Sequence, residues 1–177
     1  MKYMVAFLRQ FLLIIGLMSV FYIVAWGEEA TLSFATKDQR TTFSITEQVW
    51  EHNGITFTNN KENSSNNVAD YANPVRLYAG SSITITAPNN ITKIVAVCGS
   101  STYATNLKNS VGNEASVSGS NVTIVPTASS NSYTISSLTA QVRLNSITVT
   151  YAADVEPEPP TEYTVTFDAG TGSCDTD

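Results

Sequence analysis

Hydrophobic and polar residues alternate one by one along several short segments of the chain. Residues 82–87 read SITITA, and residues 145–151 place Ile147 and Val149 on one face with Thr148 and Thr150 on the other. This pattern is typical of strands in antiparallel sheets that bury one face. From Ala30 onward we find no helical period. The segments that favour strands are residues 30–34, 49–51, 55–59, 75–78, 82–87, 93–97, 115–118, 121–125, 133–135 and 142–151.

The number and spacing of these strands predict the fold class. Short strands follow one another closely and are separated by Asn, Gly, Ser and Pro. We therefore expect an all-β domain, an antiparallel two-sheet β-sandwich or jelly roll. Residues 93–98 (KIVAVC) are the most continuously apolar, which indicates a central strand.

The first 27 residues have the layout of a secretory signal peptide. Lys2 and Arg9 give a basic start, residues 11–26 are uncharged, and Ala25 and Gly27 are small residues at the −3 and −1 positions. A permanent anchor is the alternative, but the apolar run is shorter than the roughly 20 residues that span a bilayer. The sequence thus predicts cleavage after Gly27 and export to the cell surface or the medium, with no membrane contact after cleavage.

The mature chain divides into three parts. Residues 28–153 contain the predicted strands. Residues 154–162 (DVEPEPPTE) are a stiff linker, because three prolines and four acids cannot pack a core. Residues 163–177 begin one further strand, and one strand is not a domain. We interpret them as the first strand of a truncated second module in a larger protein, whose downstream modules would be partners within the same chain.

Composition excludes several classes of function. Ser, Thr and Asn make up 58 of the 177 residues, and the formal net charge is −6. An acidic chain is not typical of a nucleic-acid binder, which needs a basic surface. One histidine and two cysteines exclude a His/Cys metal cluster and a disulfide-rich scaffold. Cys98 is expected to be a small buried hydrophobe, and Cys174 has no evident partner.

A family resemblance covers about 100 residues. It rests on GITFTN at residues 54–59, DYANPVRLY at 70–78, SSITI at 81–85, ITKIV at 91–95 and RLNSITVTY at 143–151. These segments resemble a carbohydrate-binding-module-like β-sandwich of secreted and surface proteins of Bacteroidetes. YTVTFDA at residues 163–169 is similar to the opening of a Listeria–Bacteroides surface repeat, although GTGSC at 170–174 departs from its Asn-Gly-Gly pattern. The resemblance implies a surface location and a sandwich architecture.

Sugar binding requires aromatic rings that stack on a pyranose and polar groups that match its hydroxyls. The candidate ligand-binding residues are Trp50, Tyr71, Arg76 and Tyr103. Arg76 points outward because Val75 and Leu77 point inward, and Tyr71 and Tyr103 are expected on loops. Tyr151 shares a face with Ile147 and Val149 and is expected to be buried.

Calcium is a candidate cofactor, although none is required. The polar stretch 59–73 (NNKENSSNNVADYAN) supplies hard oxygen donors, among which Glu62 and Asp70 are the candidate metal ligands. The alternative is a flexible polar loop, since the stretch lacks the order of an EF-hand.

Catalytic residues are not predicted. His52 precedes Asn53-Gly54, a strong hairpin turn signal, and adjacent Glu51 points to the opposite face of the strand. The remaining acids are scattered, and no nucleophile elbow, zinc motif or phosphate loop occurs. We therefore predict a non-catalytic module that binds a polysaccharide or acts as an adhesive element. The alternatives are a structural spacer that presents a neighbouring module and, less favoured, a small secreted glycoside hydrolase.

Overall fold

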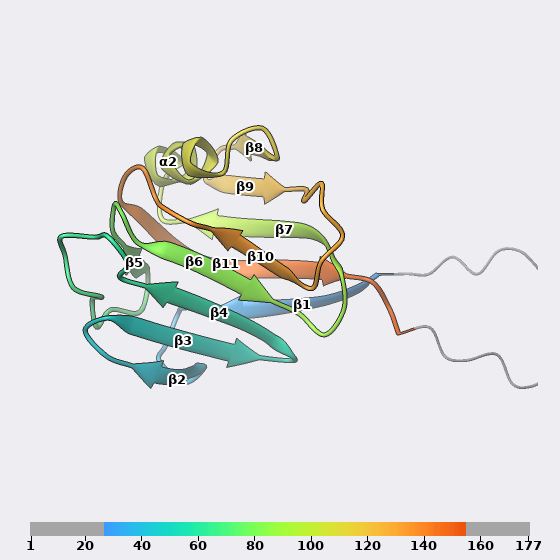
Figure 1. The fold of residues 1–177 in the computed structure, drawn as a ribbon, viewed down its shortest axis with the longest axis horizontal. Coiled ribbons are helices and arrows are strands. Elements are labelled where there is room, and N and C mark those ends of the chain that lie inside the picture. The colour runs from blue at the N-terminus through green and yellow to red at the C-terminus, as the bar shows by residue number, and fades with distance from the viewer. Residues whose placement is uncertain (1–26, 155–177) are drawn as a thin grey trace, which may run out of the picture.

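The computed structural model describes residues 27–154 and shows two antiparallel sheets packed face to face, with one short helix (Figure 1). This arrangement confirms the predicted all-β sandwich. The predicted signal peptide up to residue 26, the linker beyond Asp154 and the start of a second module lie outside the described residues.

The first sheet is organised around the longest strand. Its path runs β1 (Glu28–Ser33), β11 (Val142–Tyr151), β7 (Ile91–Cys98), β9 (Asn121–Ile124) and β8 (Ala115–Ser118). The short β5 (Val75–Leu77) also pairs with β11, at residues 142–144, whereas β1 pairs with residues 146–151. Strands β1 and β5 thus lie along β11 one after the other. β7 is central, as predicted.

The second sheet has five strands in the order β10 (Ser132–Ile135), β6 (Ser82–Thr86), β4 (Ile55–Asn60), β3 (Glu47–His52) and β2 (Arg40–Phe43). The predicted Asn-Gly turn joins β3 to β4. Asn53 and Gly54 both have positive φ, 47° and 77°, which a two-residue hairpin turn with right-handed strand twist requires. His52 flanks this turn, as predicted.

An irregularity in β11 brings its hydrophobic residues to one face. Leu144 and Ile147 are three residues apart, so in a regular strand they would point to opposite faces. The pairing of β11 with β7 shifts between Leu144 and Ser146, so that Leu144 and Ile147 are both buried. Tyr151 is also buried, as the alternation predicted.

Three aromatic residues join the two sheets. Phe34, which follows β1, packs edge-on against Trp50 of β3 with ring centroids 5.1 Å apart, and against Phe57 of β4 at 5.0 Å. All three side chains are completely buried. Edge-to-face pairs of this kind stabilise a core beyond the area they bury.

The structure corrects two expectations about secondary structure. Residues Ser101–Val111 form a helix, α2, where no helical period was found. Ser100 caps its start by accepting a hydrogen bond from the Tyr103 N–H, and only Ala104 and Leu107 are buried. The helix is polar on most of its surface, so its period is weak. Strand β2 was also missed because it is an edge strand with no buried residue.

The two ends of the described chain lie side by side. Glu28 at the start of β1 is the register partner of Tyr151 at the end of β11. Strand β5 and the loop of residues 61–74 lie at the opposite end of the sandwich (Figure 1). No helix within residues 27–154 has the length and apolar character needed to span a membrane.

We expect Trp50→Ala to lower the free energy of unfolding by about 3–5 kcal/mol, because it leaves a cavity beside Phe34 and Phe57. Trp50→Phe keeps an aromatic ring there and should cost less. Urea denaturation followed by circular dichroism measures both values. A loss below about 1 kcal/mol for Trp50→Ala would contradict this account of the core.

Candidate functional site

Two arginines face each other across neighbouring strands. Arg76 of β5 is the register partner of Arg143 of β11. The residues on either side of both arginines are buried, so both side chains lie on the outer face of the sheet. Directly opposite residues in an antiparallel pair have Cβ atoms about 5 Å apart. The sheet therefore brings two positive charges together on its surface.

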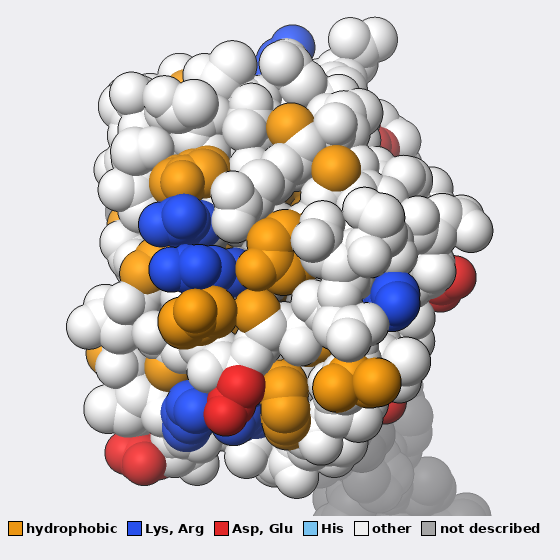
Figure 2. Space-filling model, turned by 90° about the vertical axis from the view of Figure 1, so that its left-hand side faces the viewer, with side chains coloured by type: hydrophobic (Ala, Val, Ile, Leu, Met, Phe, Trp, Pro, Cys, Tyr) orange, Lys and Arg blue, Asp and Glu red, His pale blue; other side chains and the backbone are white. Residues whose placement is uncertain are grey.

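A tyrosine packs against each arginine. The Arg76 guanidinium carbon lies 3.8 Å from the centroid of the Tyr71 ring, and that of Arg143 lies 5.1 Å from the centroid of the Tyr103 ring. The order Tyr103, Arg143, Arg76, Tyr71 forms a continuous row, which we call the Arg–Tyr ladder. Figure 2 shows this face, with blue side chains between orange ones. Stacking on a ring face holds a guanidinium plane in place without neutralising its charge.

Both tyrosines are attached to well-anchored segments. Tyr103 lies in the first turn of α2, which is tied to the start of β11 by a hydrogen bond from Asn106 Nδ2 to the Gln141 carbonyl (2.8 Å). Tyr71 lies in the loop of residues 61–74, whose backbone binds that of the core through Asn73 N–H and the Phe34 carbonyl (2.6 Å). Tyr71 is 46% exposed, so part of its ring remains accessible.

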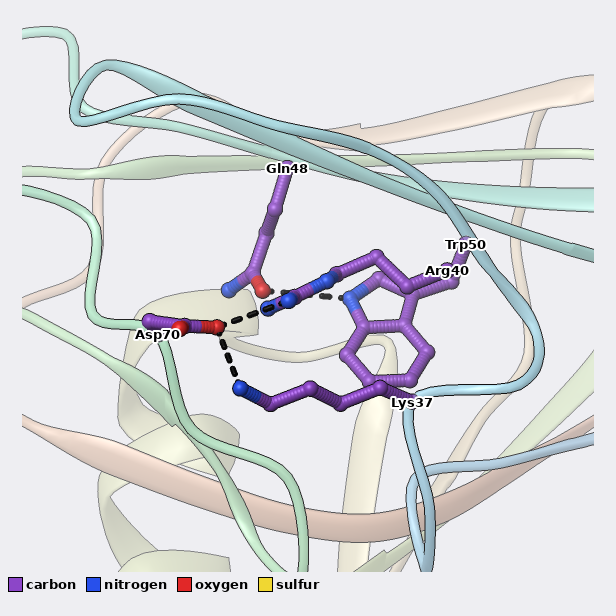
Figure 3. Close-up of polar contacts among 5 residues, drawn as sticks. All are labelled: Lys37, Arg40, Gln48, Trp50 and Asp70. Atoms are coloured by element: carbon purple, nitrogen blue, oxygen red, sulfur yellow. Dashed lines mark hydrogen bonds and ion pairs between the residues drawn. The ribbon is translucent and has the colours of Figure 1, made fainter.

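Next to Tyr71, one carboxylate holds two cations. Asp70 Oδ1 accepts a hydrogen bond from Lys37 Nζ at 2.6 Å and forms an ion pair with Arg40 Nη2 at 2.7 Å (Figure 3). These two cations hold the pKa of the Asp70 carboxyl below its usual value. We call Lys37, Arg40 and Asp70 the Asp70 cluster. Within residues 27–154 these are the ion pairs, and neither arginine of the ladder takes part in one.

The Asp70 cluster rests on a polar part of the core. Arg40 also stacks on Phe43, 4.6 Å from its centroid, and beneath it Trp50 donates a hydrogen bond from Nε1 to Gln48 Oε1 (3.2 Å). Figure 3 shows Gln48 at the N–H edge of the Trp50 ring and Arg40 over the ring. Arg40 Nη1 and Gln48 Nε2 are buried without a hydrogen-bond partner in the described part of the chain.

Three of the four predicted ligand-binding residues come together in the ladder, and the fourth does not. Tyr71, Arg76 and Tyr103 are neighbours there, although Tyr103 lies on a helix and not on a loop. Trp50 was a wrong choice, because its side chain is fully buried and cannot stack on a sugar. Arg143, which the sequence reasoning did not select, supplies the central contact.

The calcium prediction finds little support in the geometry. Asp70 is already paired with two cations, which repel a metal ion. Glu62 accepts a 3.5 Å hydrogen bond from Ser82 Oγ. In the part of the chain that the structure describes, no three His, Cys, Asp or Glu side chains are grouped so as to hold a metal.

The pKa shifts of Glu114 and Cys98 have structural causes, which are hydrogen bonds for the first and burial for the second. Glu114 accepts hydrogen bonds from the backbone N–H and the hydroxyl of Thr127 and from the Tyr133 hydroxyl (2.8 Å), which lower its pKa. Cys98 is the small buried residue that the sequence predicted, and burial raises the pKa of its thiol to about 12. Cys174 lies outside the described residues.

A shallow hollow of about 360 Å³ lies at the other end of the domain. Its lining consists of small and amide side chains and one carboxylate, namely Pro88, Asn89, Asn90, Asn131, Ala152, Ala153 and Asp154. It contains no aromatic ring and no cation. The hollow is therefore less suited than the ladder to bind a sugar ring.

Comparison with known proteins identifies no relative: no family model matches the chain, and no curated protein or solved structure is significantly similar to it. The resemblance to a Bacteroidetes surface module stays an expectation from the sequence.

We expect Asp70→Asn to lower the melting temperature at about pH 7, because Lys37 and Arg40 lose their carboxylate. A carboxyl whose pKa is lowered on folding stabilises the protein above its unfolded pKa of 3.8, and this contribution is lost as the pH falls through the folded pKa. The difference in melting temperature between Asp70→Asn and the wild type should therefore be smaller at about pH 2 than at about pH 7.

Calorimetry at both pH values measures this difference. Glu51→Gln, at an exposed position of β3, is the matched control, for which we expect little change at either pH. An Asp70→Asn deficit of the same size at both pH values would contradict the ion-pair account.

Proposed function

We propose that residues 28–153 are an exported, non-catalytic glycan-binding module that belongs to a larger surface or secreted protein. The observation that carries this proposal is the Arg–Tyr ladder, in which aromatic rings and outward-facing donors are combined on one rigid face. Sugar rings stack on aromatic faces, and their hydroxyls accept hydrogen bonds from guanidinium groups. The ladder supplies both interactions next to each other.

The shape of the site suits a polysaccharide. The ladder crosses from α2 over β11 and β5 to the loop of residues 61–74, on an outer face and not in a closed cavity (Figure 2). An extended row of this kind can contact successive residues of a chain without enclosing its ends. The exposed side chains of Phe43 and Ile45, beyond the Asp70 cluster, extend the apolar surface near Arg40.

The carboxylates favour a binding role over hydrolysis. A glycosidase needs a carboxyl group whose pKa is raised so that it can donate a proton. Among residues 27–154, the carboxyl groups with a resolved shift are Asp70 and Glu114, and both pKa values are lowered. Each carboxylate is occupied by hydrogen bonds within the domain.

Both ends of the described chain lie at one end of the sandwich, because Glu28 and Tyr151 are cross-strand partners. Strand β5 and the loop of residues 61–74, which carry Arg76 and Tyr71 of the ladder, lie at the opposite end (Figure 1). This geometry fits a module that presents a binding face.

Affinity electrophoresis of the purified chain against plant, host and bacterial polysaccharides, with and without calcium, tests the proposal. We expect retardation by at least one glycan class. Tyr71→Ala should weaken this binding about tenfold or more, equivalent to 1.4 kcal/mol, because a stacking ring is lost.

Tyr71→Phe keeps the ring and should retain most of the affinity. Val125→Ala, an exposed apolar residue beyond the end of β9, should leave it unchanged. Circular dichroism checks that each variant is folded. Absence of retardation by every polysaccharide would contradict the proposed function.

A further inference from the structure

We infer that the ligand of the ladder is an acidic glycan whose carboxylates, as in uronic acids, bind between Arg76 and Arg143. This inference rests on the proposed function and specifies the class of sugar. Its basis is an electrostatic feature of the sheet, two positive charges held face to face with no counter-charge from the described residues.

The pairing of the two arginines is unfavourable for the fold by itself. Like charges directly opposite each other in an antiparallel pair destabilise it. Asp70, which precedes Tyr71 in the chain, does not relieve this repulsion, because its carboxylate is already bound by Lys37 and Arg40. Arg143 Nε is moreover buried without a hydrogen-bond partner in residues 27–154. A like-charge pair and an unpaired buried donor both cost stability, and such costs are expected where residues are retained to bind a ligand.

The stacked tyrosines prepare the arginines for an anion. Each guanidinium is held against a ring, which reduces the side-chain entropy that is lost on binding. A planar guanidinium matches a carboxylate with two parallel hydrogen bonds. Directly after β7, Gly99 donates its N–H to the Arg143 carbonyl (2.9 Å), which anchors the backbone of Arg143.

The distribution of charge favours an acidic sugar over a uniform polyanion. The ladder and the Asp70 cluster contain four of the seven basic residues found in positions 27–154 and all three arginines of that range. Nine acidic residues occur in the same range, so this face holds more than half of the basic residues of an acidic domain. A uronic acid combines a carboxylate with a pyranose ring, and the ladder offers an arginine for the carboxylate and a neighbouring tyrosine for the ring.

Isothermal titration of the purified chain with polygalacturonate and with its fully methyl-esterified form tests the inference. The two polymers share one sugar backbone and differ in carboxylate charge. We expect polygalacturonate to bind at least about tenfold more tightly, and added salt to weaken it. Dextran sulfate and single-stranded DNA serve as polyanions that lack carboxylates, and we expect weak binding of both.

Variants locate the carboxylate contact. Arg76→Gln and Arg143→Gln should each weaken polygalacturonate binding about tenfold or more, and each should weaken binding of the methyl ester much less, because the ester loses only a hydrogen-bond donor to its hydroxyls. Lys93→Gln on β7 removes one positive charge outside the ladder and should have little effect. The arginine variants should remain folded, because removal of one charge relieves repulsion, and thermal unfolding checks this.

The outcomes separate the two proposals. Equal binding of both polymers that is lost in Tyr71→Ala would overturn the acidic-glycan inference and leave the glycan-binding module intact. Binding of dextran sulfate or DNA as tight as that of polygalacturonate would also overturn it, since the ladder would then recognise any polyanion. Failure to bind any glycan, neutral or acidic, would overturn the proposed function itself.

Discussion

Strand β11 has to bury its hydrophobic residues on one face while it pairs with three other strands, and the rest of the domain depends on how it does so. Its register shift between Leu144 and Ser146 brings residues on both sides of the shift into the core. Beyond the shift β11 pairs with β1, and before it β11 pairs with β5. One strand therefore fixes both the pairing of the chain ends and the meeting of Arg76 with Arg143.

The core and the candidate site are linked through the same end of the sandwich. Phe34 directly follows β1, near the position where the pairing partner of β11 changes from β1 to β5. Its ring packs on Trp50 and Phe57 of the other sheet. Its carbonyl accepts the N–H of Asn73, which fixes the loop that bears Tyr71. The packing of Phe34 in the core thus helps to position the exposed ring of Tyr71 on the surface.

Local sequence predicted most strands, because alternation over five or more residues is a local property. It failed for β2, which buries no residue, and for α2, whose apolar stripe is only Ala104 and Leu107. A signal for the helix did exist, since Ser100 and Gly112 are suitable residues for its two caps. Trp50 was misjudged because Gln48 and Trp50 point inward together and share a hydrogen bond, whereas Val49 is less buried.

The site was predictable only in part, for a related reason. Alternation alone indicated that Arg76 points outward, and the same reasoning applied to residues 142–144 would have placed Arg143 outward too. That the two arginines are neighbours depends on the register between β5 and β11, which are 65 or more residues apart in sequence. Tyr103 was predicted as a ligand-binding residue because it is aromatic, but its place beside Arg143 results from the packing of α2, which was not predicted. Registers and helix packing of this kind are tertiary, so a single sequence does not reveal them.

The most direct test of the account is to map where a saccharide contacts the domain. In a nuclear magnetic resonance titration with oligogalacturonate, the Nε–Hε signals of Arg76 and Arg143 and the ring signals of Tyr71 and Tyr103 should shift together and saturate at one affinity. Shifts confined to the hollow around Asn89, Asn90 and Asn131, with the ladder signals unchanged, would contradict it.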